Sequence, residues 1–129
     1  MSSLFSRIVS GEIPSHKVAE NDDFLAFLDI MPVQLGHVLV IPKKETDFIF
    51  DMDDSDLSAM ILFAKEVAQK MKLVFDCKKI GVTVIGLEVP HAHIHLIPIN
   101  SLNDMDFTKP KLTVTSEKLE EIANLIKGY

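Results

Sequence analysis

Residues 91–98 read His91-Ala92-His93-Ile94-His95-Leu96-Ile97-Pro98, so three histidines alternate with apolar residues. Side chains of a β-strand leave its two faces in turn, and this period of two predicts that all three rings leave one face of one strand. Imidazole is the side chain whose ordinary pKa lies nearest neutrality, so a row of imidazoles can supply nucleophiles, proton donors and metal ligands at pH 7. We therefore expect the function to lie in this stretch.

The segments around this strand alternate between short strands and helices. Strands are expected at 17–20, 24–30, 37–41 and 80–85, and helices at 4–11, 51–75 and 116–127. The helix at 51–75 carries an apolar stripe of period 3.6, formed by Leu57, Met60, Ile61, Ala64, Val67, Ala68, Met71 and Val74. Short turns between the strands favour antiparallel pairing, so the sequence predicts an α+β fold: a sheet of about five strands, one long helix and one or two shorter ones.

Length and composition indicate one globular domain over residues 1–129, with 47% hydrophobic and 25% charged residues. The single cysteine, Cys77, excludes an internal disulfide. A net charge of −6 argues against general nucleic-acid binding, and no apolar run is long enough for a membrane span. Residues 1–7 do not resemble a signal peptide, which leaves the cytoplasm as the expected compartment.

The histidine row is most informative as a nucleophilic centre. A neutral imidazole can attack phosphorus and carry the transferred group as a covalent phosphohistidine. The attacking ring needs one free nitrogen, while a hydrogen bond to the other nitrogen fixes the tautomer. The middle ring of a row can attack while its neighbours donate protons or hydrogen bonds to the phosphate and the leaving group.

Two other interpretations of the row stay open. Residues i and i+4 of a strand are about 13 Å apart, so His91 and His95 could share one ion only at full stretch, with bonds of about 2 Å. His93 and His95 could instead bind zinc with help from His37 or His16. Alternatively, the three rings are satisfied polar groups of a sheet, although each buried imidazole would then need its own partner.

The pattern His-x-His-x-His followed by apolar residues resembles the histidine-triad (HIT) family of nucleotide hydrolases and transferases. Three earlier blocks are similar to the family's in the same order: LFSRIVSGEIP at 4–14, FLDIMP at 27–32 and GHVLVIPKK at 36–44. The resemblance covers residues 4 to 98 approximately and points to the Hint-like branch. It implies an antiparallel sheet with a long helix, a small nucleotide substrate, no cofactor, and a homodimer paired through that helix and a sheet edge.

The resemblance also implies residue roles. In the family the middle histidine attacks the α-phosphorus of a nucleotide derivative, and water then releases the nucleoside monophosphate. Carried over, His93 is the nucleophile, His91 and His95 flank it, and His95 lies nearest the leaving group. His37 matches a further active-site histidine, and Asp29 matches a carboxylate that holds the ribose hydroxyls. The walls around the base are matched by Phe5, Ile8, Phe27 and Ile30.

The loop before the triad departs from the family. Many members have a longer glycine-rich loop with an Asn and a Gln on the phosphate, whereas this chain has only residues 85–90. Gly86 still fits the phosphate side. Glu88 would repel a phosphate, so either the phosphate is held differently or the leaving group is cationic, in which case an amine fits better than a polyphosphate. Ser3 and Ser6 stand where some relatives have zinc-binding cysteines, so we expect no structural zinc.

The resulting expectation is a nucleotide hydrolase or nucleotidyl transferase of purine preference that works through His93 without a metal. Two other classes remain open. The shortened loop would suit a nucleotide-binding or scaffold protein with little turnover. The histidine row would also suit a metal-dependent hydrolase.

Overall fold

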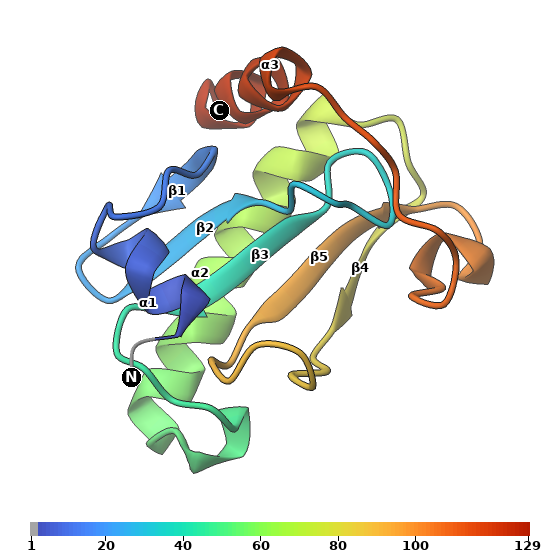
Figure 1. Cartoon of the computed structure of the whole chain (residues 1–129). Helices are drawn as coiled ribbons and strands as arrows, with labels where there is room; N and C mark the ends of the chain where they lie inside the picture. Colours follow the sequence, from blue (N-terminus) through green and yellow to red (C-terminus); the bar gives the residue numbers. More distant parts are fainter. Residues whose placement is uncertain (1–2) are drawn as a thin grey trace.

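The computed structural model describes residues 3–129, and Met1 and Ser2 of the N-terminal segment lie outside it. Its centre is a five-stranded antiparallel sheet in the order β1-β2-β3-β5-β4 (Figure 1). The strands are β1 (Lys17–Glu20), β2 (Phe24–Leu28), β3 (Val38–Pro42), β4 (Lys79–Thr83) and β5 (Ile94–Ile99). The helices are α1 (Leu4–Val9), α2 (Asp54–Val74) and α3 (Ser116–Lys127), with short 3-10 turns η1 (Ile49–Asp51) and η2 (Leu102–Met105). The predicted α+β fold is confirmed.

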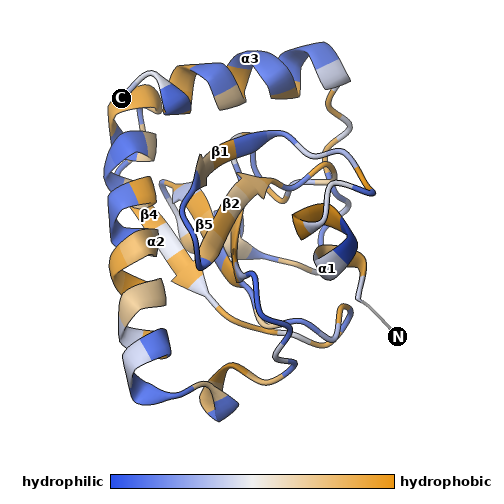
Figure 2. Ribbon diagram, turned by 90° about the vertical axis from the view of Figure 1, so that its left-hand side faces the viewer, coloured by the Kyte–Doolittle hydropathy of each residue, from blue (hydrophilic) through white to orange (hydrophobic). Residues whose placement is uncertain are grey.

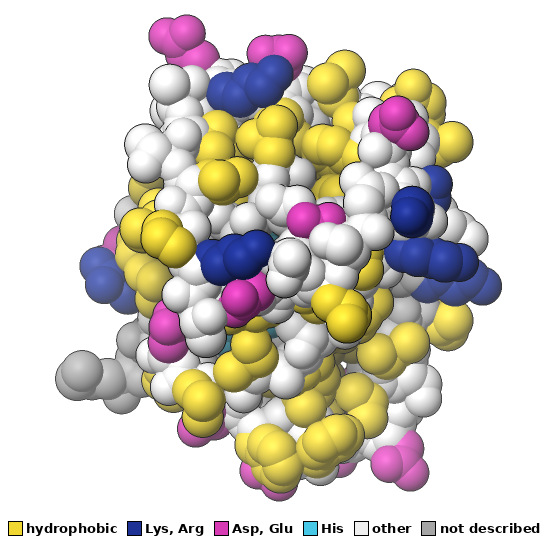
Figure 3. Space-filling view, turned by 90° about the vertical axis from the view of Figure 1, so that its right-hand side faces the viewer, with side chains coloured by type: hydrophobic (Ala, Val, Ile, Leu, Met, Phe, Trp, Pro, Cys, Tyr) yellow, Lys and Arg dark blue, Asp and Glu magenta, His cyan; other side chains and the backbone are white. Residues whose placement is uncertain are grey.

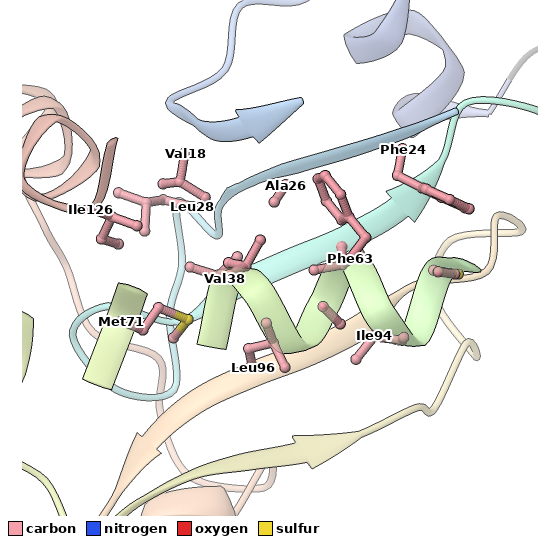
Figure 4. Packing of buried hydrophobic residues seen from close by; sticks show 14 of the residues in the cluster. Val18, Phe24, Ala26, Leu28, Val38, Phe63, Met71, Ile94, Leu96 and Ile126 are labelled. Atoms are coloured by element: carbon pink, nitrogen blue, oxygen red, sulfur yellow. The ribbon is translucent and has the colours of Figure 1, made fainter. Parts of the chain in front are cut away.

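The sheet lies between helices on both faces (Figure 2). One face packs against α2 through a core that includes Phe24, Ala26, Leu28, Val38, Phe63, Met71, Ile94 and Leu96 (Figure 4). The other face packs against α1 through a second cluster of Phe5, Ile8, Leu25, Phe27, Leu39 and Ile41. Strands β2 and β3 are therefore buried on both faces, which explains why 37–41 reads as a continuous apolar run. Across the β1 edge lies α3, which contacts both β1 and α2.

The long helix differs from its prediction in two details. It begins at Asp54, because η1 occupies 49–51 before it. Its buried residues are Met60, Phe63, Ala64, Val67 and Met71, of which Phe63 was not in the predicted stripe. Ile61, predicted to be buried, is 49% exposed. Among residues 3–129, no helix is long and apolar enough to cross a membrane.

The histidine strand is shorter than predicted, because β5 begins at Ile94 and only His95 of the triad lies in it. The ladder with β3 ends at the pair of Val40 and Ile94. Continued by two residues, the register would set Pro42 opposite Ala92, and proline has no N–H to donate to a ladder. Ala92 instead donates its N–H to the carbonyl of Thr46 at 2.6 Å. The prediction of three rings from one strand is therefore wrong.

Candidate active site

The three rings of the triad nevertheless gather on the α1 face of the sheet. His95 in β5 lies opposite Leu39 in β3, which lies opposite Phe27 in β2, so its side chain shares the face of the second core cluster. His91 and His93 lie in the bend that leads into β5, and both are buried. The ring centroids of His93 and His95 are 4.8 Å apart. The bend thus keeps the rings closer together than a straight strand would.

His93 is held in one tautomer. Its Nδ1 lies 2.7 Å from the main-chain carbonyl oxygen of His91. A carbonyl only accepts hydrogen bonds, so Nδ1 carries the proton and Nε2 of the neutral ring keeps a free lone pair. Among residues 3–129, Nε2 of His93 has no hydrogen-bond partner. This is the arrangement that a nucleophilic imidazole needs.

A second hydrogen-bond chain orients His95. The main-chain N–H of Val33 donates to Nδ1 of His37 at 3.1 Å, so the neutral His37 ring carries its proton on Nε2. That Nε2 lies 2.9 Å from Nδ1 of His95 and donates to it. The proton of a neutral His95 must then sit on its own Nε2, where it can be given to a bound molecule. One tautomer chain therefore sets a proton donor beside the free lone pair of His93.

Burial keeps His37 and His95 uncharged. Desolvation, together with His95 beside it, lowers the pKa of His37 to about 3. Desolvation followed by the charge of His93 lowers the pKa of His95 to about 4. Nδ1 of His37 also lies 3.9 Å from a carboxylate oxygen of Asp29. Because that nitrogen accepts from Val33 and carries no proton, the contact is not an ion pair.

Asp29 directly follows β2, which ends at Leu28 instead of continuing to residue 30 as predicted. Its N–H donates to the carbonyl of His37, and one carboxylate oxygen accepts from the N–H of Met31 at 2.9 Å. This turn aims the carboxylate at the histidines, and burial raises its pKa. The same turn leaves Ile30 65% exposed and outside the residues that line the cavity described next, so its role beside a base stays a prediction.

The candidate cavity measures about 170 Å³. It is lined by Asp29, His37, Ile85, Gly86, Leu87, Glu88, His93, His95, Phe107 and Lys111. Six of these are residues singled out from the sequence: Asp29, His37, Gly86, Glu88, His93 and His95. On this face of the molecule only small areas of histidine are visible, next to basic and acidic side chains (Figure 3). The cavity is thus narrow and carries charge at its entrance.

The short loop before the triad forms one wall of the cavity. Gly86 has a φ of +73°, a conformation that favours glycine, and no atom lies near where its Cβ would stand. Glu88 is exposed, and its negative charge raises the pKa of Asp29 slightly after the larger effect of burial. The loop therefore brings a carboxylate to the cavity, as its sequence implied.

The apolar residues expected around a base do not line this cavity. Phe5, Ile8 and Phe27 are buried in the second core cluster. Phe5 lies edge-on to His93, with ring centroids 4.9 Å apart, and the Phe27 ring is 5.6 Å from that of Phe5. Through Phe5, the second core cluster therefore packs against the ring of His93.

Sequence reasoning missed four residues of the cavity. Ile85 and Leu87 lie in the short loop before the triad, whereas Phe107 and Lys111 lie in the segment after η2, which was expected to be only a polar loop. The Phe107 ring packs against His95 at 4.9 Å and His37 at 5.9 Å. The lone aromatic residue in a polar loop was the only local signal, since nothing in the pattern places that loop over the triad.

His91 does not reach the cavity but connects the triad to the N-terminus. Its Nε2–H donates to the carbonyl of Pro42 at 2.7 Å, so its Nδ1 accepts from the hydroxyl of Ser3 at 2.8 Å. Glu45 accepts from the N–H of Ser3 at 2.6 Å and from the hydroxyl of Ser6 at 2.8 Å. These bonds lower the pKa of Glu45 to about 2.

The residues considered for a metal site are only partly brought together. His37 and His95 bond to each other through ring nitrogens. His16 lies elsewhere, where its Nδ1 contacts a carboxylate oxygen of Glu120 at 2.9 Å. Within 3–129, no group of three or more His, Cys, Asp or Glu side chains is arranged to hold a metal ion.

Comparison with known proteins gives a family for this chain. The model of the HIT domain matches residues 10–102. The chain belongs to the HIT family. A HIT-like protein of Borreliella burgdorferi, described as uncharacterized, is 34% identical over 93% of this chain and 92% of its own length. The adenosine 5'-monophosphoramidase hnt1 of Schizosaccharomyces pombe is 32% identical over 98% of this chain and 100% of its own length.

A solved structure supports the same assignment. The Hit-like protein from Bartonella henselae superimposes with a TM-score of 0.86 and 33% identity, and covers 98% of this chain and 95% of its own. The HIT resemblance noted over about 4–98 is confirmed. The segment of this HIT protein that carries Phe107 and Lys111 lies beyond the residues that the family model matches.

Proposed function

We propose that this HIT protein is a nucleotide hydrolase that cleaves a purine nucleotide conjugate at its α-phosphate through a nucleotidyl-His93 intermediate. The observation that carries the proposal is the pair of ring nitrogens at the cavity. Nε2 of His93 has a free lone pair because its Nδ1 donates to the His91 carbonyl. Nε2 of His95 carries a proton because its Nδ1 accepts from His37. A nucleophile thus lies beside a proton donor.

In the first step the lone pair of His93 Nε2 forms a bond to the α-phosphorus. The bond from phosphorus to the leaving group breaks, and the leaving atom takes its electron pair and the proton of His95 Nε2. The negative charge left on the His95–His37 pair is balanced by the positive charge that forms on the phosphorylated ring of His93. In the second step a water oxygen attacks the phosphorus and gives its proton to His95. The N–P bond then breaks, and its electron pair returns to His93. The nucleoside monophosphate leaves, and both rings are back in their starting tautomers.

The other residues have roles that follow from their positions. Asp29, whose carboxylate faces the cavity, can accept two hydrogen bonds from the ribose diol. Gly86 lets the main chain approach the phosphate closely. His91 supplies the carbonyl that orients His93. The relationship to an adenosine 5'-monophosphoramidase supports a nitrogen-linked leaving group, such as that of a nucleoside phosphoramidate or an adenylated amine.

The test is AMP release from adenosine 5'-phosphoramidate by the wild type, His93→Ala and His16→Ala. The last variant is a matched control, because His16 is a histidine outside the cavity. We expect release from the wild type and His16→Ala, loss of release in His93→Ala, and an adenylyl adduct by mass spectrometry in the wild type. AMP binding without release or adduct would favour the binding-protein alternative, and release abolished by a chelator would favour a metal-dependent hydrolase.

We also propose that the protein is a homodimer joined along α2 and the β4 edge of its sheet. An apolar hollow of about 650 Å³ lies between the first turns of α2, the segment around η1 and the loop that follows β4, and it includes Phe48, Phe50, Leu57, Ile61, Val84, Ile85 and Leu87. Its residues include Phe50 at 73% and Leu87 at 88% exposure, which a second copy would cover. Ile61→Glu should give monomers in analytical ultracentrifugation, whereas Leu125→Glu on α3, also an exposed helix position, should not. A monomeric wild type would refute the proposal.

A further inference from the structure

The segment of residues 106–112, here called the strap, closes the cavity at the His95 end. Phe107 lies on the rings of His95 and His37, at 4.9 and 5.9 Å between centroids. Further along, the N–H of Leu112 donates to the carbonyl of Pro32 at 2.9 Å. The strap is thus attached at one end to the histidines and at the other to the loop between β2 and β3.

The strap holds a cation in a fixed place. Nζ of Lys111 donates to the carbonyl of Phe107 at 2.7 Å and lies 5.4 Å from the centroid of the Phe107 ring. Both contacts keep the ammonium group close to its own segment and at the cavity, which Lys111 lines. In the described part of the chain, Lys111 forms no ion pair. A half-buried ammonium without a carboxylate partner favours an anionic ligand group beside it.

The position of this cation in the proposed reaction follows from its neighbours. Lys111 sits over Phe107, and Phe107 sits on His95, the ring that gives its proton to the leaving group. The charge of Lys111 also contributes to the lowered pKa of both His95 and His37. Lys111 also lowers the pKa of Asp29, whereas Glu88 raises it. Because Phe107 packs on His95, Lys111 lies at the leaving-group end of the cavity.

We propose that Lys111 selects for a leaving group that carries an acidic substituent, so that the substrate is AMP joined through nitrogen to an amine bearing a carboxylate. This inference rests on the proposed function. The leaving nitrogen takes the proton of His95, and the carboxylate on the same molecule pairs with Lys111. The negative charge of Glu88 suggested a cationic leaving group. With Lys111 in the cavity, the protein itself supplies the positive charge at the leaving-group end, so the leaving group need not carry one.

The test compares AMP release from three adenosine 5'-phosphoramidates, formed on β-alanine, β-alaninamide and 1,3-diaminopropane. These leaving amines are of similar size and end in a carboxylate, a neutral amide and an ammonium group. We expect the ratio of kcat/KM for the carboxylate over the amide to fall about fivefold from the wild type to Lys111→Gln, the size of one partly exposed ion pair. Lys111→Glu should shift the preference to the diamine. Lys109→Gln, a lysine of the same strap outside the cavity, should leave the ratio unchanged.

The possible outcomes separate a failure of the proposed nucleotide hydrolase function from a failure of the role given to Lys111. No AMP release from any of the three conjugates and no adduct would refute the proposed function itself. Release from all three with the same ratio in the wild type and Lys111→Gln would refute this inference alone. An equal fall for all three in Lys111→Gln would also refute it, because Lys111 would then act on the phosphate. If Lys111→Gln fails to fold, the wild type still decides: its preference for the carboxylate should shrink in high salt, and a salt-independent ratio would refute the inference.

Discussion

Nε2 of His37 donates a hydrogen bond to Nδ1 of His95, and this contact fixes which nitrogen of His95 carries a proton. His37 is far from the triad in the sequence, because it lies in the turn just before β3. Its own Nδ1 is occupied by the N–H of Val33, so the donor cannot change direction while the ring is neutral. The main-chain N–H of Val33 thus determines, through His37, which nitrogen of His95 carries the proton.

Replacing His37 should impair proton donation by His95. In His37→Phe the ring of His95 loses its donor and its tautomer is no longer fixed, so we expect kcat to fall by about tenfold to a hundredfold with a poorly leaving amine. The loss should be smaller with a leaving group that needs no proton, such as a nitrophenol. His37→Gln keeps an N–H and should lose less than His37→Phe. Equal losses with both kinds of leaving group would contradict the role, and steady-state kinetics on the two substrates measure it.

Folding stability should decrease as the pH falls. Burial lowers the pKa of His37 to about 3 and of His95 to about 4, whereas histidines of an unfolded chain titrate near about 6.5. Below about pH 6.5 these two histidines bind protons in the unfolded chain but stay unprotonated in the folded chain. The free energy of unfolding therefore falls with pH until His37 and His95 are protonated in the folded chain as well. Each histidine contributes a slope of up to about 1.4 kcal/mol per pH unit.

Urea unfolding between about pH 7.5 and pH 4.5 measures this dependence. Above 6.5 the contribution of these two rings is complete and constant, and it is lost toward lower pH. His37→Gln has one such ring fewer and should show a shallower decline. An identical decline in the wild type and the variant would show that His37 does not supply it.

Ser3 should stabilise the triad through His91. Its hydroxyl is the donor to the buried Nδ1 of His91, so Ser3→Ala leaves that nitrogen only the longer contact to the Ser6 hydroxyl at 3.4 Å, and it also removes the N-cap bond that Ser3 accepts from the N–H of Ser6. We expect a loss of about 1 kcal/mol in the free energy of unfolding, and a lower kcat because the carbonyl that orients His93 belongs to His91. Ser3→Thr should restore both, and Ser10→Ala, on the exposed end of α1, is the control. Unfolding in urea and steady-state kinetics test the prediction, which an unaffected Ser3→Ala would overturn.

Glu88 should discriminate against polyphosphates. Its carboxylate lines the cavity from the short loop before the triad, where a chain of phosphates would pass it. We expect Glu88→Gln to raise turnover of a dinucleoside polyphosphate severalfold while changing that of adenosine 5'-phosphoramidate much less. The two rates are compared in one assay of AMP release, and an equal change in both would remove Glu88 from this role.

The alternation of apolar residues was enough to predict most of the fold. The stripe at 51–75 and the continuous run at 37–41 gave the long helix and the doubly covered strand, because burial acts on each element separately. The three earlier sequence blocks also led to residues that meet at one cavity, such as Asp29 and His37, which are far from the triad in the chain.

The errors arose where chain ends and turns decide the geometry. The strand β2 was predicted to continue to residue 30, but the Asp29 side chain forms a turn with Met31 and the strand stops at Leu28. Phe107 and Lys111 belong to a loop whose path depends on contacts with distant segments, and no local period encodes such a path. The row of rings was placed correctly on one face, but through a bend whose cause, Pro42, lies in a different strand.

The partner that orients His93 is a main-chain carbonyl, not a side chain. Every residue has a carbonyl, so a substitution at position 91 can move this acceptor but cannot delete it. Variation there should therefore produce a graded series of enzymes, slower in proportion to how far the bend is displaced. A substitution at position 93, by contrast, removes the reacting atom and leaves nothing to adjust. Substitutions at two histidines of one motif should thus have different effects. A random library across 91–95 should show graded activities for changes at position 91 and complete loss of activity for changes at position 93.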